Sequence, residues 1–432
     1  MKLPFQHIGF NGWLKLVLAA IFSLYAAMFG YEYLANGIFH PVGFDLLAFW
    51  SAGKAALSNS FSSVYDLETL AQIQYSALRD PGISVTEFLP FPVSLFPFFI
   101  LPFTLIASLD ASPAYWLWTV FNSLALVGYL VFLIRHLKPK TRAFPTLLLI
   151  LSISSYAVYQ NFYWGQVEVG LLIIAGEFLR MILEKKPIAA GLWLGGMLLK
   201  PQVLVLVLPW LVLARQWKII QGFSISALVI LLVSILLGSW DGMLQMARLW
   251  TQFLPGMYSN GPENMINWRM LGIHLNGITH SSFGWIAAGL GMALTGTLCL
   301  RLLPRRHKKP TEEHLVHQLT GVLAASLIFT WHSHIHMAMV MIPFLIFGWL
   351  NGNLPQRTVV SWTILPAVLQ ILVLVLAALM FTKLVPWIQG VGGLILGLSG
   401  LIIHLVLILQ VLKHQPVSAQ SHLQNQPCLY RS

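Results

Sequence analysis

The stretch PIAAGLWLGGMLLKPQVLVLVLPWLVLA, residues 187–214, contains a single charged residue, Lys200, in an otherwise apolar tract. A helix needs about 20 apolar residues to cross the hydrocarbon core of a bilayer. The tract is long enough, but Pro201 has no backbone N–H, and a proline inside a helix breaks its hydrogen-bond ladder. We therefore predict two half-helices that form a hairpin, with Lys200 at the break, rather than one span.

The rest of the chain has the same apolar character. Of its 432 residues, 57% are hydrophobic and 9% are charged, whereas soluble domains carry about 25% charged residues. The composition predicts an all-α polytopic membrane protein with a single domain over residues 1–414 and a polar tail over 415–432. Besides 187–214, we expect apolar spans at about 13–33, 113–134, 143–160, 165–183, 219–238, 283–303, 315–331, 334–350, 358–380 and 384–412.

A further apolar run at 88–108 is interrupted by Pro90, Pro92, Pro97 and Pro102. Lipid offers no partner to a backbone group that has lost its hydrogen bond, so a straight helix does not tolerate this proline density. We expect this run not to cross the membrane.

The net charge of +11 does not indicate a nucleic-acid partner, because the basic residues sit in short loops between apolar runs. That pattern marks cytoplasmic loops and suits anionic lipid headgroups. With 88–108 and 187–214 treated as non-crossing, both termini are cytoplasmic and two large outer loops result, at about 34–112 and 239–282. The predicted inner basic residues are Arg135, Lys138, Lys140, Arg142, Arg180, Lys185, Lys186, Arg215, Lys218, Arg301, Arg305, Arg306, Lys308, Lys309 and Arg357, together with Lys2, Lys15, Lys413 and Arg431 in the termini.

The first outer loop is predicted to contain a helix that lies along the membrane surface. Within 62–80, Leu67, Leu70, Ile73 and Leu78 recur at helical spacing opposite a polar face. This amphipathic pattern is typical of interfacial helices. The two cysteines, Cys299 and Cys428, predict neither a disulfide framework nor a metal site.

Asp45 is the candidate catalytic base. It lies in an apolar context, Phe-Asp-Leu-Leu-Ala-Phe-Trp, just beyond the first span. Partial desolvation of a carboxylate raises its pKa toward that of a useful base. The alternative interpretation is an N-cap for a helix over 46–57, a position that Asp favours. The two roles are compatible.

Lys200 and Arg269 are the candidate phosphate-binding cations. An ionisable group within a membrane tract indicates function, and an anion is the natural partner of a lysine. Arginine can bind phosphate with two parallel hydrogen bonds. The alternatives are that Lys200 snorkels to the surface and that Arg269 is an ordinary interfacial arginine.

Glu168 lies at the outer end of a predicted span and could bind a sugar hydroxyl or a cation, although an acid in the first turn is also favoured by the helix dipole alone. His332, His334 and His336 suggest a metal cluster at first sight, but no acidic or cysteine partner is near in sequence and metal geometry is demanding. We expect no metal and predict that His332 and His334 contact a phosphate or a sugar. Gly191-x-x-x-Gly195 and Gly393-x-x-x-Gly397 predict close helix packing.

Taken in order, these features resemble the membrane glycosyltransferases of the GT-C fold, and among them glycosyltransferase family 87. No glycine-rich phosphate loop is present, so direct use of ATP or of a nucleotide sugar is disfavoured. The residues that carry the resemblance are Phe44-Asp45, Phe49 to Leu57, Val64-Tyr65-Asp66, Phe88 to Pro92, Pro97 to Pro102, Trp116, Asn122, Gly165-Gln166-Val167, Ala190-Gly191, Leu199-Lys200-Pro201 and Trp268 to Gly272.

The resemblance covers most of 12–350 and implies a donor of polyprenyl-phosphate-sugar type, with mannose as the sugar. It implies a glycan or glycolipid acceptor, a multi-pass protein of the plasma membrane, and inversion at the anomeric carbon with Asp45 as base. No cofactor is implied, and a divalent metal is not indicated. We expect Lys200, Arg269, His332 and His334 to bind the donor phosphate, and Gln166, Glu168 and Tyr65 to bind the sugar or the acceptor. This chain departs from the family pattern at Glu168, where Asn is usual, and at Leu89, where Tyr is usual.

Two other classes of function fit a polytopic chain. A transporter or flippase of a lipid-linked sugar would carry intramembrane cations, but it would be expected to show symmetry-related broken segments, and the surroundings of the two broken segments do not match as repeats. A membrane scaffold would leave the Lys200 break and the outer acids unexplained.

Overall fold

The computed structural model describes residues 10–39, 42–78, 88–137, 145–253, 265–304, 310–379 and 385–414. Within these ranges the regular structure is helical, apart from two isolated β-bridges. The predicted tail at 415–432 lies outside them. Six helices in the described part of the chain are long and apolar enough to cross a bilayer: α1 (Phe10–Asn36), α5 (Ala111–His136), α11 (Trp217–Arg248), α14 (Phe283–Arg301), α17 (Gln356–Leu379) and α18 (Val385–Lys413).

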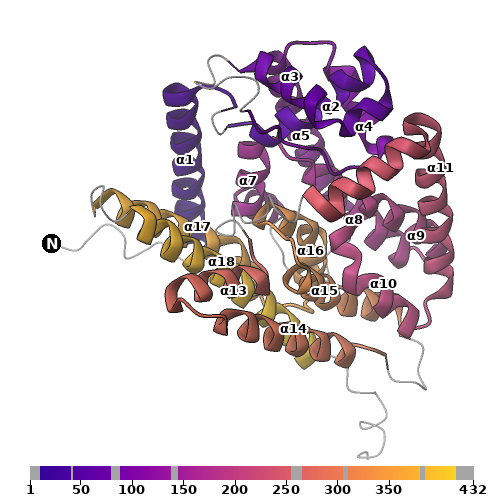
Figure 1. Ribbon diagram of the computed structural model, residues 1–432. Helices are drawn as coiled ribbons and strands as arrows, with labels where there is room; N and C mark the ends of the chain where they lie inside the picture. Colours follow the sequence, from indigo (N-terminus) through magenta and orange to yellow (C-terminus); the bar gives the residue numbers. More distant parts are fainter. Residues whose placement is uncertain are drawn as a thin grey trace, which may run out of the picture.

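The centre of the bundle is formed by α8 (Glu168–Leu183), α15 (Glu312–Phe329), the 3-10 helix η6 (Ile335–Met341) and α16 (Ile342–Leu350). Almost every residue of η6 and α16 is buried, as is α15 from Leu315 onward. In Figure 1, α15 and α16 lie between α18 and α10 (Leu204–Leu213) near the middle of the view. The chain is therefore an all-α polytopic membrane protein, as its composition predicts.

Two predicted spans are built differently from what the sequence suggests. The run expected as one helix at 143–160 forms α6 (Pro145–Ile153) and α7 (Tyr156–Trp164), separated at Ser154-Ser155. The span expected at 334–350 begins with the 3-10 turns of η6 before α16. A 3-10 helix rises about 2 Å per residue and an α-helix about 1.5 Å. The 3-10 turns therefore lengthen a segment that is short for a span.

The tract at 187–214 does break at Lys200. The half before Lys200 consists of α9 (Pro187–Gly196) and η2 (Met197–Leu199), and the half after it consists of η3 (Pro201–Val203) and α10 (Leu204–Leu213). Helix α9 runs parallel to α11, because a Cβ on Gly191 would meet the Ile219 carbonyl oxygen at 2.0 Å and one on Gly195 would meet Ser226 Oγ at 1.8 Å. The starts of α9 and α11 thus share one end of the bundle, and α10 returns to that end. The two halves of the predicted hairpin pack on different helices: α9 packs on α8 and α11, whereas α10 packs on α15. The hairpin is therefore open.

The first predicted outer loop folds into α2 (Phe44–Ser58), η1 (Phe61–Tyr65), α3 (Leu67–Ala77) and α4 (Pro97–Ile106). Helix α3 is shorter than the predicted 62–80, because Asp66 caps it by accepting the N–H groups of Glu68 and Thr69; residues 79 and 80 lie outside the described ranges. Helix α4 has 10 residues and is about 15 Å long, too short to cross a bilayer alone.

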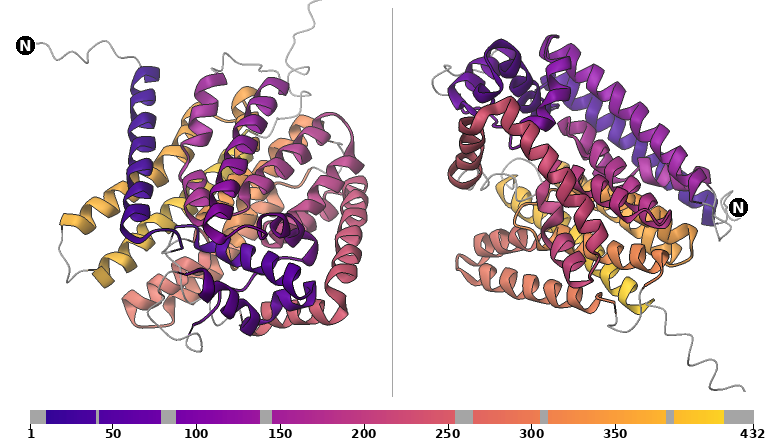
Figure 2. Two further views of the ribbon diagram at one scale, coloured as in Figure 1. Left: turned by 90° about the horizontal axis from the view of Figure 1, so that it is seen from above. Right: turned by 90° about the vertical axis from the view of Figure 1, so that its right-hand side faces the viewer.

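Helix α11 bends at Ser239, whose φ of 60° is non-helical. Around the bend the helix packs against η1 and α4, and the chain continues through a π-helical turn, η4 (Leu249–Phe253), as the right-hand view of Figure 2 shows. After 254–264, which lies outside the described ranges, α13 (Trp268–Thr279) packs against α14.

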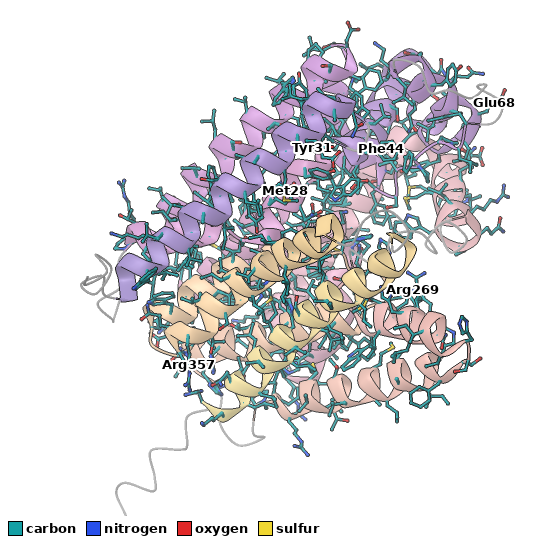
Figure 3. All side chains as sticks on the ribbon, turned by 90° about the vertical axis from the view of Figure 1, so that its left-hand side faces the viewer. Met28, Tyr31, Phe44, Glu68, Arg269 and Arg357 are labelled. Atoms are coloured by element: carbon teal, nitrogen blue, oxygen red, sulfur yellow. The ribbon has the colours of Figure 1, made fainter. Side chains whose placement is uncertain are left out.

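Different ionisable groups lie at the two ends of α8. At one end, His136 Nε2 of α5 lies 3.2 Å from Glu184 beyond α8, and Arg180 pairs with both Glu177 and Glu184. The opposite end of α8 begins with Glu168. Figure 3 places Phe44 and Glu68 toward one end of the molecule and Arg357 toward the other.

Candidate active site

A tight turn after α7 places Gln166 beside Asp45. Helix α7 ends at Trp164 and is followed by Gly165, whose φ of +71° is disfavoured for residues with a side chain. A Cβ on Gly165 would lie 2.7 Å from Leu46 Cβ. The Gly43 N–H donates to the Tyr163 carbonyl at 2.8 Å. This contact fixes the start of α2 against the end of α7, so two segments far apart in the sequence meet.

Asp45, Gln166 and Lys200 form a hydrogen-bonded chain across three elements. Gln166 Nε2 donates to Asp45 Oδ2 at 2.5 Å, and Lys200 Nζ donates to Gln166 Oε1 at 3.1 Å. One amide side chain therefore connects the candidate base to the candidate phosphate-binding cation. Just after the break at Lys200-Pro201, Ser326 Oγ accepts the Leu206 N–H and donates to the Val203 carbonyl, which ties this segment to α15.

Glu168 is fully buried at the first turn of α8 and lies between two potential cations. Its Oε1 is 3.4 Å from Lys200 Nζ and 2.9 Å from His336 Nδ1. The Glu168 backbone N–H donates to Asn161 Oδ1 at 3.0 Å. Its Oε2 is buried without a hydrogen-bond partner. Glu168 is thus a first-turn acid and also the anionic centre of the site, and one of its oxygens can still accept a hydrogen bond.

Asp45 is not the helix cap that the sequence allowed as an alternative. Helix α2 begins at Phe44 after Gly43, whose φ of 77° supplies the turn, and no side chain caps it. The Asp45 carboxylate faces Gln166 instead. Burial raises the pKa of Asp45, and His336, Gln166 and Lys200 partly offset that rise. A raised pKa makes the carboxylate a stronger proton acceptor.

Lys200 does not snorkel to the surface. Its side chain is 16% exposed and is held by Gln166 and Glu168. Arg269 is likewise buried rather than interfacial. Its guanidinium carbon lies 5.1 Å from the centroid of the Trp331 ring. Arg269 sits in the first turn of α13, where the positive end of the helix dipole adds to its own charge and favours an anion.

The three histidines extend from Glu168 toward Arg269. The ring centroids of His336 and His334 are 5.4 Å apart, and those of His334 and His332 are 4.5 Å apart. Burial, followed by the charges of Lys200, Arg269 and His336, lowers the pKa of His332 to about 3. His332 is therefore neutral at physiological pH, and it lies within the electrostatic reach of both cations. Among the residues that the structure describes, no group of three metal-ligating side chains is placed to hold an ion.

Tyr65 stands apart from this chain of contacts. Its buried hydroxyl donates to the Leu95 carbonyl at 2.6 Å and holds η1 against the segment before α4. The predicted sugar- or acceptor-binding role of Tyr65 remains a prediction. The predicted site residues do not include His336, although its place two residues after His334 was the available signal. They also do not include Asn161, whose role depends on the turn at Gly165.

The fold and the site together define a multi-pass membrane protein with a buried acid–base cluster at one end of its helical bundle. The model of glycosyltransferase family 87 matches residues 97–330, more than half of the chain, and the protein belongs to this family. Comparison with curated proteins and with solved structures found no match. The matched range contains Gln166, Glu168, Lys200 and Arg269, whereas Asp45 and the three histidines lie outside it.

Membership of this family makes the protein a glycosyltransferase, which takes a sugar from a donor to an acceptor.

Proposed function

We propose that this glycosyltransferase transfers a hexose, mannose, from a polyprenyl-phosphate donor to a hydroxyl group of an envelope glycan or glycolipid. The observation that carries the proposal is the contact between Asp45 and Gln166, with Lys200 bound to the other end of the same amide. This arrangement holds a carboxylate and a cation at a fixed separation, as a displacement needs its base and its leaving-group partner.

In the proposed reaction Asp45 takes the proton of the acceptor hydroxyl. The hydroxyl oxygen then forms a bond to the anomeric carbon of the sugar. The bond between that carbon and the phosphate oxygen breaks, and the lipid phosphate leaves with the electron pair. This single displacement inverts the anomeric configuration and requires no covalent sugar–enzyme intermediate. Gln166 lowers the pKa of Asp45 and so favours the ionised base.

The donor phosphate is assigned to Lys200 and Arg269, with His332 and His334 beside them. The effect of both cations on the pKa of His332 supports this grouping. Because His332 is neutral, it contributes a hydrogen bond rather than a charge. The N-terminus of α13 adds to the positive field around Arg269.

Glu168 is assigned to a hydroxyl group of the sugar or of the acceptor, together with Gln166. Its Oε2 is buried without a partner, and burial of such an oxygen is costly until a donor reaches it. A sugar hydroxyl would supply that donor. The same carboxylate lies against Lys200 and the His336 ring, so the buried lysine is not left unopposed.

We place the site on the non-cytoplasmic face of the plasma membrane. The charged cluster of Arg180, Glu184 and Lys186 lies at the opposite end of α8 from Glu168, and loops rich in basic residues stay in the cytoplasm. Membrane lipids surround the protein, and nucleic acid has no role. Accessibility labelling of a cysteine placed at position 45 tests this orientation, and labelling from the cytoplasmic side contradicts it.

The direct test supplies the purified protein with a radiolabelled polyprenyl-phosphate-mannose and an extract of envelope glycolipids. We expect a labelled glycolipid whose new linkage has the configuration opposite to that of the donor. Retained configuration would exclude the displacement. Movement of the intact donor across a vesicle membrane without sugar transfer would favour a flippase. Mass spectrometry of envelope glycans from cells with and without the protein would identify the acceptor.

A further inference from the structure

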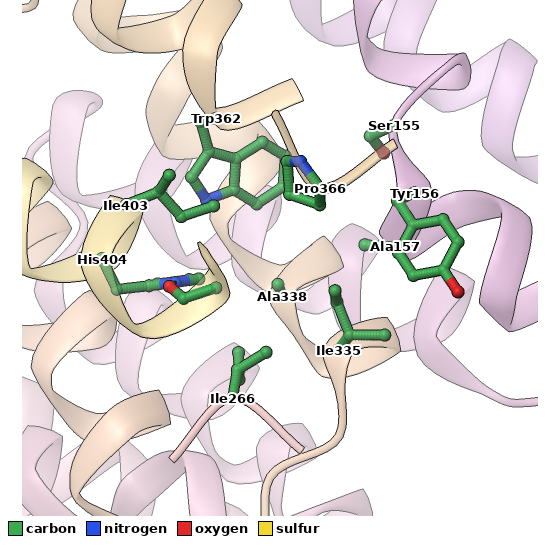
Figure 4. Close-up of a pocket in the computed structure, with 11 residues that line it drawn as sticks. Ser155, Tyr156, Ala157, Ile266, Ile335, Ala338, Trp362, Pro366, Ile403 and His404 are labelled. Carbon is green, nitrogen blue, oxygen red and sulfur yellow. The ribbon is translucent and has the colours of Figure 1, made fainter. Parts of the chain in front are cut away.

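A small cavity lies between α7, α17 and α18, behind the segment that carries His334 (Figure 4). Its wall includes Ser155, Ile266, Ile335, Trp362 and His404. The space open to the centre of a water molecule is about 10 Å³, which corresponds to roughly one water position. The cavity is lined mainly by apolar atoms, so the few polar groups that border it decide what it can hold.

Three buried polar atoms on this wall have no hydrogen-bond partner: Ser155 Oγ, Trp362 Nε1 and His404 Nε2. The residues that bear them are 1%, 5% and 1% exposed, in that order. His404 Nδ1 lies 2.6 Å from the Gly400 carbonyl oxygen. A carbonyl can only accept, so Nδ1 carries the hydrogen, and in the neutral ring Nε2 is an acceptor. The wall therefore presents an indole donor, an imidazole acceptor and a hydroxyl that can act as either.

The donor and the acceptor are close but not in contact. The ring centroids of Trp362 and His404 are 6.3 Å apart with an interplanar angle of 71°, and Figure 4 shows the indole nitrogen on the side of Trp362 that faces His404. Pro366 has no N–H, so it cannot donate the helical hydrogen bond to the Trp362 carbonyl four residues earlier. A buried polar group without a partner is costly. This concentration of such groups at one cavity points to a missing polar ligand.

We propose that the cavity binds an ordered water molecule that accepts the Trp362 N–H and donates to His404 Nε2. These two partners fall within the range of two to four hydrogen bonds that a buried water makes. A lipid chain would leave all three atoms unsatisfied, so hydrocarbon is not the expected occupant. The water links α17 with α18, at a site separate from the glycosyltransferase centre.

The bound water has a structural consequence for the active site. The Ile266 N–H donates to the Ser333 carbonyl at 3.0 Å, which pairs the segment before Arg269 with the histidine segment. Ile266 also packs on Gly400 of α18: a Cβ on Gly400 would lie 2.4 Å from Ile266 Cγ2. The water fixes α18 against α17 directly behind this pair of segments and thereby supports the position of Arg269.

The first test is a structure of the full-length protein in lipid nanodiscs without donor, at a resolution that shows ordered water. We expect a discrete peak at about 2.7–3.2 Å from both Trp362 Nε1 and His404 Nε2. An empty cavity overturns the proposal, and so does elongated density that continues into the lipid. This test uses the unaltered protein and does not depend on a variant that folds.

The second test compares thermal unfolding of Trp362→Phe, His404→Leu and the double variant in one detergent. If water bridges the pair, each single variant lowers the unfolding midpoint by about 1–3 °C, and the double variant loses less than the sum. If the cavity is dry, Trp362→Phe removes an unsatisfied N–H and raises the midpoint, which contradicts the proposal. Trp210→Phe is the matched control, because Trp210 Nε1 is also buried without a partner but does not line this cavity; we expect no loss there.

Discussion

Gln166 Nε2 donates to Asp45 Oδ2 at 2.5 Å, although 121 positions of sequence separate the two residues. The contact exists because Gly165 turns the chain at the end of α7 and Gly43 turns it at the start of α2. Two glycines therefore set the position of the candidate base relative to the amide that orients it.

Asp45→Asn removes the proton acceptor and keeps the size of the side chain. We expect sugar transfer to fall by about 10²–10⁴-fold, with expression and unfolding midpoint unchanged. The assay is transfer from a labelled polyprenyl-phosphate sugar. Asp110→Asn is the matched control, since Asp110 is an exposed carboxylate before α5 whose side chain makes no cap hydrogen bond. Undiminished turnover in Asp45→Asn would refute the assignment.

The pH dependence of transfer follows from the raised pKa of Asp45. Burial raises that pKa, and the base works only when ionised, so activity falls as the pH drops through the pKa. Gln166 lowers this pKa by its hydrogen bond. In Gln166→Leu the pKa of Asp45 rises further, and we expect the acid limb of the kcat/KM profile to move to higher pH. A limb that stays in place, or moves to lower pH, would count against Asp45 as the titrating group.

Lys200→Ala removes a cation assigned to the donor phosphate. A hydrogen bond to a charged group contributes about 1.5–3 kcal/mol, which corresponds to a loss of roughly 10–100-fold in kcat/KM for the donor. We expect the effect to exceed that on acceptor kinetics. Lys186→Ala serves as the control, because Lys186 pairs with Glu184 at the other end of α8. Unchanged donor kinetics in Lys200→Ala would remove the phosphate assignment.

The stability of the site depends on the buried ion pair between Lys200 and Glu168. Removal of one partner of a buried ion pair costs about 3–5 kcal/mol, because the other charge stays buried. Lys200→Met leaves Glu168 with His336 alone and should lower the unfolding midpoint. Adding Glu168→Gln to Lys200→Met should restore part of the loss. Equal midpoints for the single and the double variants would show that the two residues are not energetically coupled.

Gly165→Ala tests whether the turn after α7 positions Gln166. A side chain at a φ of +71° is strained, and its Cβ would lie 2.7 Å from Leu46 Cβ. We expect a loss of more than about 1 kcal/mol of stability and a decrease in kcat as Gln166 moves away from Asp45. Gly128→Ala is the control, because a Cβ there meets nothing within 4 Å and alanine favours a helix interior. Equal activity of Gly165→Ala and the wild type would argue against a positioning turn.

The six long apolar helices in the described part of the chain and the break at Lys200-Pro201 are predictable from the sequence, because hydropathy and a missing N–H act locally. The break at Ser154-Ser155 and the 3-10 turns of η6 are not, since apolar runs of this length give no periodic signal that separates one helix from two. The acid and the cations of the site could be selected as ionisable residues in apolar surroundings. Their pairing could not, because the contacts of Glu168 with His336 and of Asp45 with Gln166 join elements distant in the chain.

The close backbone contact between α9 and α11 determines the position of Lys200 along the axis of the bundle. A Cβ on Gly222 would lie 2.1 Å from the Ile188 carbonyl oxygen, and one on Gly191 would lie 2.0 Å from that of Ile219. Substitution at either glycine forces the two helices apart and displaces the chain that ends at Lys200. A genetic screen for inactive alleles would therefore recover substitutions at these glycines. The resulting variants would bind the donor poorly, although neither glycine touches a substrate.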